Sequence, residues 1–492
     1  MNGNGRPSER DRDEDAARRT PPDVVFRWLL LSAAIVAIVA VALVGPCRRR
    51  ADWLVALYFA GDDQLLSVGD LGEPRERVLW DFNEVERIGS SDRVTIVAQI
   101  DRYGPGAASE DDDAWTAARR YLVERDDDLF TIGSERVADL GEVDMSDPTV
   151  LADFVRWAVG AYPAERVLLV IGGHGLGWRG VLNDATSTTG EPMSLHAFRD
   201  AVEEGLETTG IDRVDVLGFD ACLMGQLEVL AAVEPLADVV VASECTTPDI
   251  GWGYEGFLKE LTDDPAMDGR MLAEAIVAAF LHGDAWVVDE AWRVIDTLEL
   301  YGAIEPDERS DVGRMDHDEL VHLCGDRGIK YADVPNVTQR IAESVRKHAV
   351  LAAFDLSRLP AALESVGRLA DALRVQTPSS LLATRAACHT IDETLCWSPT
   401  APVNVDARVL LDALRGSAPL DDVVGDVGVA LDRLILDVKR YGELDRFGWV
   451  SIYFPGSASN GLGEYRTLAE AFASRSGWAD VLDAVFVGPG AP

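Results

Sequence analysis

The segment that decides the fold is LGFDACLMGQLEVL, residues 217–230. It continues an apolar run that begins at Val214, which predicts a buried strand ending at Asp220. Leucines at 223, 227 and 230 follow at helical spacing, so we expect a helix directly after the strand, running through about Val233. A lone cysteine, Cys222, therefore stands at the corner between a strand and a helix.

Apolar runs and amphipathic segments alternate on both sides of this segment. Runs typical of strands cover residues 53–60, 93–100, 166–173, 214–220 and 237–244. Segments with helical spacing cover residues 80–88, 150–162 and 195–207. Continuous apolar strands separated by helices predict an α/β fold with a mostly parallel sheet covered on both faces. In such sheets, reactive groups gather at the carboxyl ends of the strands.

Two of these strands are followed by residues that carry chemistry. The run 166–173 leads into His174 within GGHGLGWRG, and the run 214–220 leads into Cys222. An imidazole at a neighbouring strand end can activate a thiol, and a following helix favours a thiolate at its amino end. Taken alone, each residue also fits a structural role, since buried free cysteines are common. The pair favours catalysis, because the two residues lie 48 positions apart, near the caspase-like spacing of about 50.

GGHGLGW and GFDACLMG, in this order, resemble the clostripain-type cysteine peptidases (family C11), which share the caspase-like fold. The likeness extends along most of residues 52–260 and resumes at 352–359 and 448–455. It implies a caspase-like three-layer sandwich around a mostly parallel sheet, with peptide-bond hydrolysis as the activity.

The same resemblance assigns roles to individual residues. It implies that Cys222 is the nucleophile, that His174 is its catalytic partner, and that the backbone N–H groups of Gly175 and Cys222 form the oxyanion hole. Asp220 matches an acid of the S1 pocket, and Asp249 is a candidate second acid. Carboxylates there would bind a P1 arginine through two hydrogen bonds or a P1 lysine as a point charge. The alternative for Asp220 is a helix N-cap.

Two features depart from the family pattern. Members can cut themselves after a basic residue between the histidine and the cysteine, yet residues 180–198 contain no Lys or Arg, so we expect the protein to work as one chain. Residues 285–348 look like an insertion, for which a solvated loop is preferred over a lid or a pro-segment. Trp178 and Trp252 are expected to pack around the site rather than contact the substrate.

No cofactor or metal is required by the sequence. The family includes calcium-dependent members, and the acidic runs 110–113 and 126–128 offer oxygens, but such runs are more typical of solvated turns. His317, His322 and Cys324 match no zinc spacing and are expected on a polar helix.

The composition excludes some partners. With 85 acidic and 45 basic residues among 492, the formal net charge is -40, which argues against nucleic acid. Only four of the basic residues are lysines, and an acidic, lysine-poor surface favours a salt-adapted protein. Six scattered cysteines without a CxxC pair argue against a disulfide framework.

The amino terminus predicts a retained membrane anchor. Residues 1–23 form a charged leader with little to bury, and we expect them to be disordered. Residues 24–46 contain seventeen consecutive uncharged residues, 28–44, with arginines on both sides. The long leader disfavours a cleaved signal, and Pro46 disfavours lipidation of Cys47. The distribution of arginines weakly favours a single-pass protein with its large domain outside the cytoplasm.

After the anchor we expect a catalytic domain (51–284), the insertion (285–348) and an α+β C-terminal part (349–492) that completes the core. The predicted function is a membrane-anchored cysteine endopeptidase that cleaves after Arg or Lys through a His–Cys dyad and a thioester acyl-enzyme. Two alternatives stay open: a catalytically silent caspase-like module that binds basic peptides, and a caspase-like peptidase specific for Asp or Asn at P1.

Overall fold

The structure of the chain is a computed structural model. It describes residues 50–61, 67–68, 74–75, 77–102, 115, 117–128, 132–184, 186–187, 189–247, 251–280, isolated residues between 294 and 315, 317–330, 349–395, 404–416, 419–440, 450–457 and 461–487. Residues 51–492 belong to one compact unit. The predicted leader and anchor lie outside the described residues. Among the described residues, no helix combines the length and the apolar character needed to cross a membrane.

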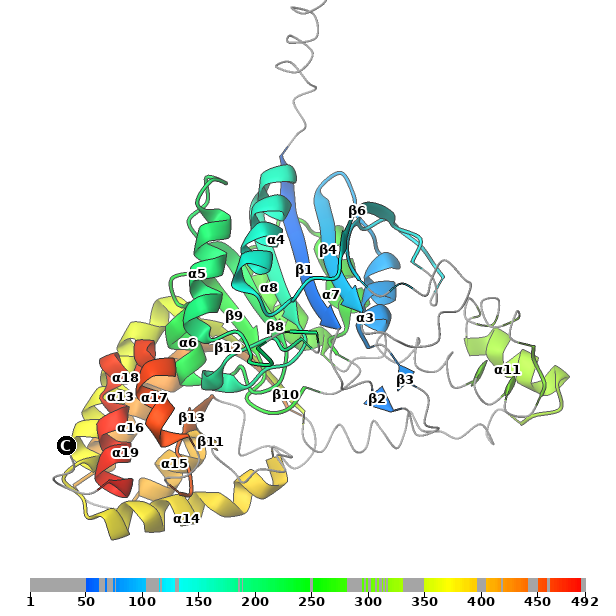
Figure 1. Cartoon of the computed structure of the whole chain (residues 1–492). Coiled ribbons are helices and arrows are strands. Elements are labelled where there is room, and N and C mark those ends of the chain that lie inside the picture. Colours follow the sequence, from blue (N-terminus) through cyan, green and yellow to red (C-terminus); the bar gives the residue numbers. More distant parts are fainter. Residues whose placement is uncertain are drawn as a thin grey trace, which may run out of the picture. The chain divides into compact units, whose positions relative to one another are not determined.

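A nine-stranded sheet forms the centre of this unit, with the strand order β12-β10-β9-β8-β7-β1-β4-β5-β6 (Figure 1). Five neighbouring strands are parallel: β9 (Ala237–Ala242), β8 (Val214–Asp220), β7 (Ala164–Gly172), β1 (Ala51–Gly61) and β4 (Val94–Arg102). Antiparallel strands flank them: β5 (Ala118–Leu122) and β6 (Glu135–Gly141) beyond β4, and β10 (Val350–Asp355) and β12 (Ile435–Arg440) beyond β9. The predicted mostly parallel α/β sheet is confirmed.

Helices cover both faces of the sheet because its central strands are apolar on both sides. Along β1, Leu54, Ala56 and Tyr58 belong to one core cluster, while the alternate residues, such as Trp53 and Val55, belong to another. The first cluster is shared with α4 (Pro148–Ala161), α5 (Leu195–Leu206) and α6 (Leu227–Val233). The second is shared with α3 (Arg77–Glu86), α7 (Tyr254–Asp263) and α8 (Gly269–Ala279). The result is a three-layer arrangement (Figure 1).

The C-terminal part contributes to the same sheet and to the first core cluster. Its strands β10 and β12 extend the sheet beyond β9. Its helices are α13 (Leu359–Leu373), α14 (Pro378–Leu395), α15 (Ala407–Leu414), α16 (Asp421–Leu434), α17 (Leu462–Leu468), α18 (Glu470–Ser476) and α19 (Trp478–Phe486). A separate two-stranded sheet pairs β11 (Asn404–Asp406) with β13 (Ser451–Tyr453). Of these elements, α18 and β13 pack against α6.

The part of the predicted insertion that the structure describes is more than a solvated loop. Helix α11 (His317–Asp326) buries Leu320 and Cys324 in a small apolar cluster with Ile295 and Leu298. His317 and His322 lie on this helix, as expected. No group of three potential metal ligands occurs among the described residues.

Candidate active site

His174 and Cys222 follow two neighbouring parallel strands at the same edge of the sheet. Gly172 at the end of β7 is in register with Asp220 at the end of β8, so each of the two residues lies two positions beyond a paired strand end. The pairing continues for one more step, because the N–H of Gly173 donates to the carbonyl of Asp220 over 3.2 Å. Both His174 and Cys222 are partly exposed. The topology therefore places the two predicted residues just beyond neighbouring strand ends, where both are partly exposed to solvent.

The loop that carries His174, residues 173–180 (the His174 loop), lies against the turn that carries Cys222, residues 221–226 (the Cys222 turn). A Cβ atom built at Gly175 would collide with the carbonyl oxygen of Cys222 and would also press on Met224. Only a glycine allows this close approach of two backbones. The contact places the backbone of Gly175, the predicted oxyanion-hole residue, directly beside Cys222.

The Cys222 turn is not the start of a helix, contrary to the prediction. Helix α6 begins at Leu227, with Gln226 as its N-cap, so Cys222 gains no thiolate stabilisation from a helix amino terminus. Leu223 has a φ of 64°, a left-handed conformation that is costly for leucine. Its N–H donates to the carbonyl of Cys245 at 2.9 Å, and the N–H of Gly225 donates to Ser243 at 2.7 Å. The segment after β9 thus imposes the turn.

A second strained residue supports the His174 loop. Leu182 has a φ of 63°, and its N–H donates to the carbonyl of His174 over 2.8 Å. Among the described residues, Leu182 and Leu223 are the two non-glycine residues with positive φ. Backbone strain that concentrates beside two chemically reactive side chains is typical of functional sites.

The sulfur of Cys222 accepts a hydrogen bond that could not be predicted from the sequence. The backbone N–H of Thr247 lies 3.3 Å from Sγ of Cys222. An N–H donor directed at sulfur favours the thiolate over the thiol. Thr247 follows β9 in the segment ASECTTPDIGW, but a backbone donor leaves no signature in the side-chain pattern.

Asp220 is buried and is not a helix cap. It is 1% exposed, and its Oδ2 accepts hydrogen bonds from the Tyr254 hydroxyl at 3.1 Å and from the backbone N–H of Trp252 at 3.3 Å. A Cβ at Gly251 would lie 3.0 Å from that Oδ2 and 2.5 Å from Oδ1 of Asp81, a residue of α3 that the sequence did not indicate as part of the site. Two carboxylates thus approach one glycine, beside the site. Asp249, the other predicted acid, lies outside the described residues.

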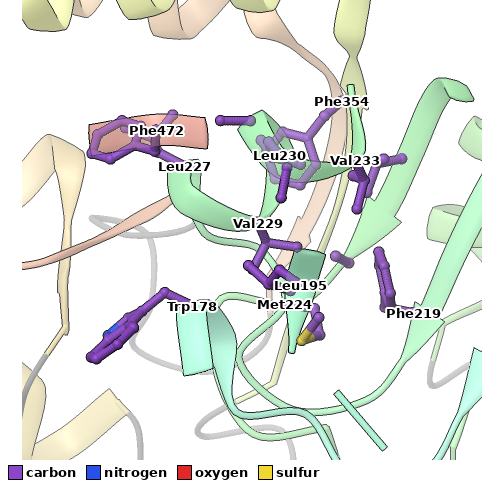
Figure 2. Close-up of a cluster of buried hydrophobic side chains, with 14 of the residues drawn as sticks. Trp178, Leu195, Phe219, Met224, Leu227, Val229, Leu230, Val233, Phe354 and Phe472 are labelled. Atoms are coloured by element: carbon purple, nitrogen blue, oxygen red, sulfur yellow. The ribbon is translucent and has the colours of Figure 1, made fainter. Parts of the chain in front are cut away.

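The two tryptophans pack around the site, as expected. Trp252 is fully buried and stacks on Tyr254 with 6.3 Å between ring centroids. Trp178, 2% exposed, contacts the rings of Tyr453 at 4.9 Å and Tyr465 at 5.3 Å, both from the C-terminal part. Figure 2 shows the cluster of buried apolar side chains on and around α6, in which it labels Trp178, Leu195, Phe219, Met224, Leu227, Val229, Leu230, Val233, Phe354 and Phe472. The His174 loop and the Cys222 turn therefore both pack against a buried apolar cluster.

Sequence comparison identifies the family. The sequence profile of the Clostripain family (peptidase C11) matches residues 81–401, well over half of the chain, including His174, Asp220 and Cys222. The chain belongs to the clostripain family. Clostripain from Hathewaya histolytica is 26% identical over 198 residues, which cover 35% of this chain and 38% of that protein. The aligned stretch thus spans well under half of the curated relative.

Solved structures of C11 peptidases share the fold of this clostripain-family chain. A secreted C11 cysteine protease from Bacteroides thetaiotaomicron, in complex with an irreversible peptide inhibitor, superposes with a TM-score of 0.53 at 16% identity, covering 87% of this chain and 99% of that one. An inactive zymogen C11 protease from Parabacteroides distasonis gives a TM-score of 0.52 at 13% identity, covering 88% and 99%. The likeness covers most of this chain, so the chain shares the α/β fold of these C11 peptidases, with its large and mostly parallel central sheet.

Proposed function

We propose that this clostripain-family chain is a membrane-anchored cysteine endopeptidase that hydrolyses peptide bonds after Arg or Lys. The observation that supports the proposal is the position of His174 and Cys222 just beyond neighbouring strand ends, with Gly175 packed against the Cys222 backbone. A thiol, an imidazole and bare backbone N–H groups in one place are the components of acyl transfer.

The proposed reaction begins when the Cys222 thiolate attacks the scissile carbonyl carbon. A carbon–sulfur bond forms, and the carbonyl π electrons move to oxygen, where the N–H groups of Gly175 and Cys222 stabilise the oxyanion. His174 gives a proton to the departing amine as the carbon–nitrogen bond breaks, leaving a thioester on Cys222. Water then attacks the thioester with His174 as the base, and the carbon–sulfur bond breaks, which releases the carboxylic acid and restores the Cys222 thiolate with the proton on His174. The Thr247 N–H supports the thiolate form.

Specificity for a basic P1 side chain is proposed to come from Asp220. Two hydrogen bonds to Oδ2 fix the orientation of its carboxylate, and Asp81 adds a second negative charge nearby. A buried carboxylate favours a guanidinium or an ammonium group over a neutral side chain because of charge pairing in a desolvated site. Specificity for Asp or Asn at P1 required Asp220 to be a helix cap, and its hydrogen bonds do not favour that alternative.

The activity is tested with the full chain in mild detergent at high salt, with a thiol reductant, beside Cys222→Ala. Each protein is incubated with fluorogenic peptides that carry Arg, Lys, Asp or Asn at P1, with and without calcium. We expect release after Arg or Lys by the wild type alone. If the folded wild type releases nothing but binds basic peptides, the silent binding module becomes the better account.

The anchor and its orientation are proposed from residues 24–46 and the flanking arginines. We expect the catalytic part to lie outside the cytoplasm and the protein to remain with membranes. Protease added to intact cells that express the full chain should degrade the catalytic part. Degradation only after lysis would contradict this orientation, and recovery in the supernatant after alkaline carbonate extraction would contradict the anchor.

A further inference from the structure

Gln226 is a fully buried amide at the end of the Cys222 turn, and it contacts two other segments. Its Oε1 accepts the N–H of Trp178 in the His174 loop at 2.6 Å, and its Nε2 donates to Oδ1 of Asn404 in β11 at 2.8 Å. A backbone N–H can only donate, so the oxygen of Gln226 must face Trp178. This requirement fixes the amide orientation, and Asn404 must then accept.

The hydrogen bond between Trp178 and Gln226 joins equivalent positions of the His174 loop and the Cys222 turn. Trp178 is four residues after His174, and Gln226 is four residues after Cys222. Gly177, the residue before Trp178, has a φ of 60°, and a Cβ at this position would lie 2.6 Å from Oε1 of Gln226. The His174 loop has glycines at 173, 175, 177 and 180, which give it few conformational constraints of its own. Its position must come from contacts such as this one.

The C-terminal part holds both partners in place. Gln226 forms a bridge with Ser451, whose N–H donates to the carbonyl of Gly225 at 2.9 Å. Trp178 lies against the rings of Tyr453 and Tyr465. The hydrogen bond between the two loops is therefore made in a buried site, where an unpaired N–H is costly.

We propose that Gln226 is a positioning residue that sets the geometry of His174 relative to Cys222, and that Asn404 extends this control to the C-terminal part. The inference rests on the proposed function. A misplacement of about 1 Å at a catalytic group can lower a rate about a hundredfold. A purely structural Gln226 would change the stability of the protein but not the chemistry of Cys222.

The test uses the full chain as wild type, Gln226→Met and the control Gln99→Met. Methionine matches the shape of glutamine but makes neither amide hydrogen bond. Gln99 is also fully buried and also makes two side-chain hydrogen bonds, to Arg120 and Met145, but it lies within β4. The rate of Cys222 alkylation by iodoacetamide is followed against pH by mass spectrometry of the peptide that contains Cys222. Peptidase kinetics and thermal unfolding are measured in parallel.

For Gln226→Met we expect the midpoint of the alkylation profile to move to higher pH, and kcat to fall about 30-fold or more with KM within about threefold. Gln99→Met should lose thermal stability and keep the wild-type profile. If folded Gln226→Met kept the alkylation profile and the kcat of the wild type, the inference would be overturned. The same would follow if Cys222 of the wild type were alkylated with the pH dependence of a free thiol. A shifted profile without any peptide cleavage by the wild type would retain the inference and reject the proposed function.

Asn404 provides a second test that does not depend on how Gln226→Met folds. Asn404→Asp keeps the oxygen that accepts from Gln226, whereas Asn404→Leu removes it. We expect wild-type alkylation for Asn404→Asp and a shift in the direction of Gln226→Met, but smaller, for Asn404→Leu. Equal, unshifted profiles for both variants would overturn the role of Asn404.

Discussion

The backbone N–H of Thr247 points at the sulfur of Cys222 across 3.3 Å, so the segment after β9 supplies a donor to a thiol that follows β8. We expect Thr247→Pro, which removes this N–H, to move the midpoint of Cys222 alkylation to higher pH. The thiolate loses a hydrogen bond that favours it. The measurement is the alkylation rate against pH.

Thr247→Val is the matched control, because it keeps the N–H and the shape of the side chain. No partner for the buried Thr247 hydroxyl is found among the described residues, so its loss should leave folding stability unchanged or raise it by about 1 kcal/mol. The alkylation profile should equal that of the wild type. A shift as large in Thr247→Val as in Thr247→Pro would assign the effect to the side chain instead.

Gly175→Ala should inactivate the enzyme while leaving it folded. The new Cβ would collide with the carbonyl of Cys222, which forces the His174 loop away from the Cys222 turn. We expect kcat to fall by about a hundredfold or more, because the catalytic groups are displaced. Gly160→Ala in α4 meets no atom within 4 Å and should keep kcat and gain up to about 1 kcal/mol of stability. Equal kcat values in the two variants would rule out the close approach as a catalytic requirement.

Asp220→Asn should weaken the preference for basic P1 residues. It removes the charge that would pair with the substrate but keeps an oxygen for Tyr254 and Trp252. We expect kcat/KM for Arg substrates to fall about a hundredfold or more. Asp81→Asn should have a smaller effect in the same direction, because its charge is an additional one beside Gly251.

Asp127→Asn is the control for these two variants, because Asp127 is exposed, with 77% of its side chain accessible. It should keep the kcat/KM of the wild type on each substrate. If Asp220→Asn lost no more activity on Arg substrates than Asp127→Asn, Asp220 would not be an acid of the S1 pocket.

Glu228 should make the folded state less stable as the pH rises from about 5 to 8. Burial raises the pKa of this carboxyl from 4.5 to about 7, although hydrogen bonds from Tyr465 and Tyr453 act in the opposite direction. The unfolded chain releases the proton near the ordinary pKa, so the folded state binds more protons between these values. The protonated carboxyl therefore contributes its full stabilisation below the pKa that Glu228 has in the unfolded chain. This contribution is lost as the pH rises through the pKa of the folded state, and the total loss in the free energy of unfolding is on the order of 3 kcal/mol.

Glu228→Gln mimics the protonated acid and should flatten this pH dependence. Urea unfolding midpoints at pH 5 and pH 8 measure the difference. Glu86, whose pKa burial also raises to about 7, contributes the same slope to every variant compared. Glu364→Gln, an exposed control, should keep the wild-type slope. A Glu228→Gln protein with the wild-type slope would show that Glu228 is not the buried group that titrates.

The sequence by itself predicted the five parallel strands, the helices between them apart from the start of α6, and the positions of His174 and Cys222 just beyond two strand ends. Buried parallel strands are continuous apolar runs, and the residue after such a run stands at the reactive edge of the sheet. The strands, and the residues that directly follow them, can be predicted because the hydrophobic pattern of a strand is formed by consecutive residues. The first turn of α6 was mispredicted, because Leu223 has helical spacing but is held in a left-handed conformation by carbonyls of Ser243 and Cys245 around it.

Only the tertiary structure decided how the two reactive residues are supported. Thr247 reaches Cys222 through a backbone N–H, and Asp81 comes from a helix more than a hundred positions before Asp220. In the sequence, Gln226 is a polar residue without a distinctive motif. Its role is visible only from its hydrogen bonds with Trp178 and Asn404. Such contacts join segments that are far apart in the chain and depend on distances of a few ångströms. The spacing of residues along the sequence does not predict those distances. They are set by the way β8, β9 and the C-terminal part pack together.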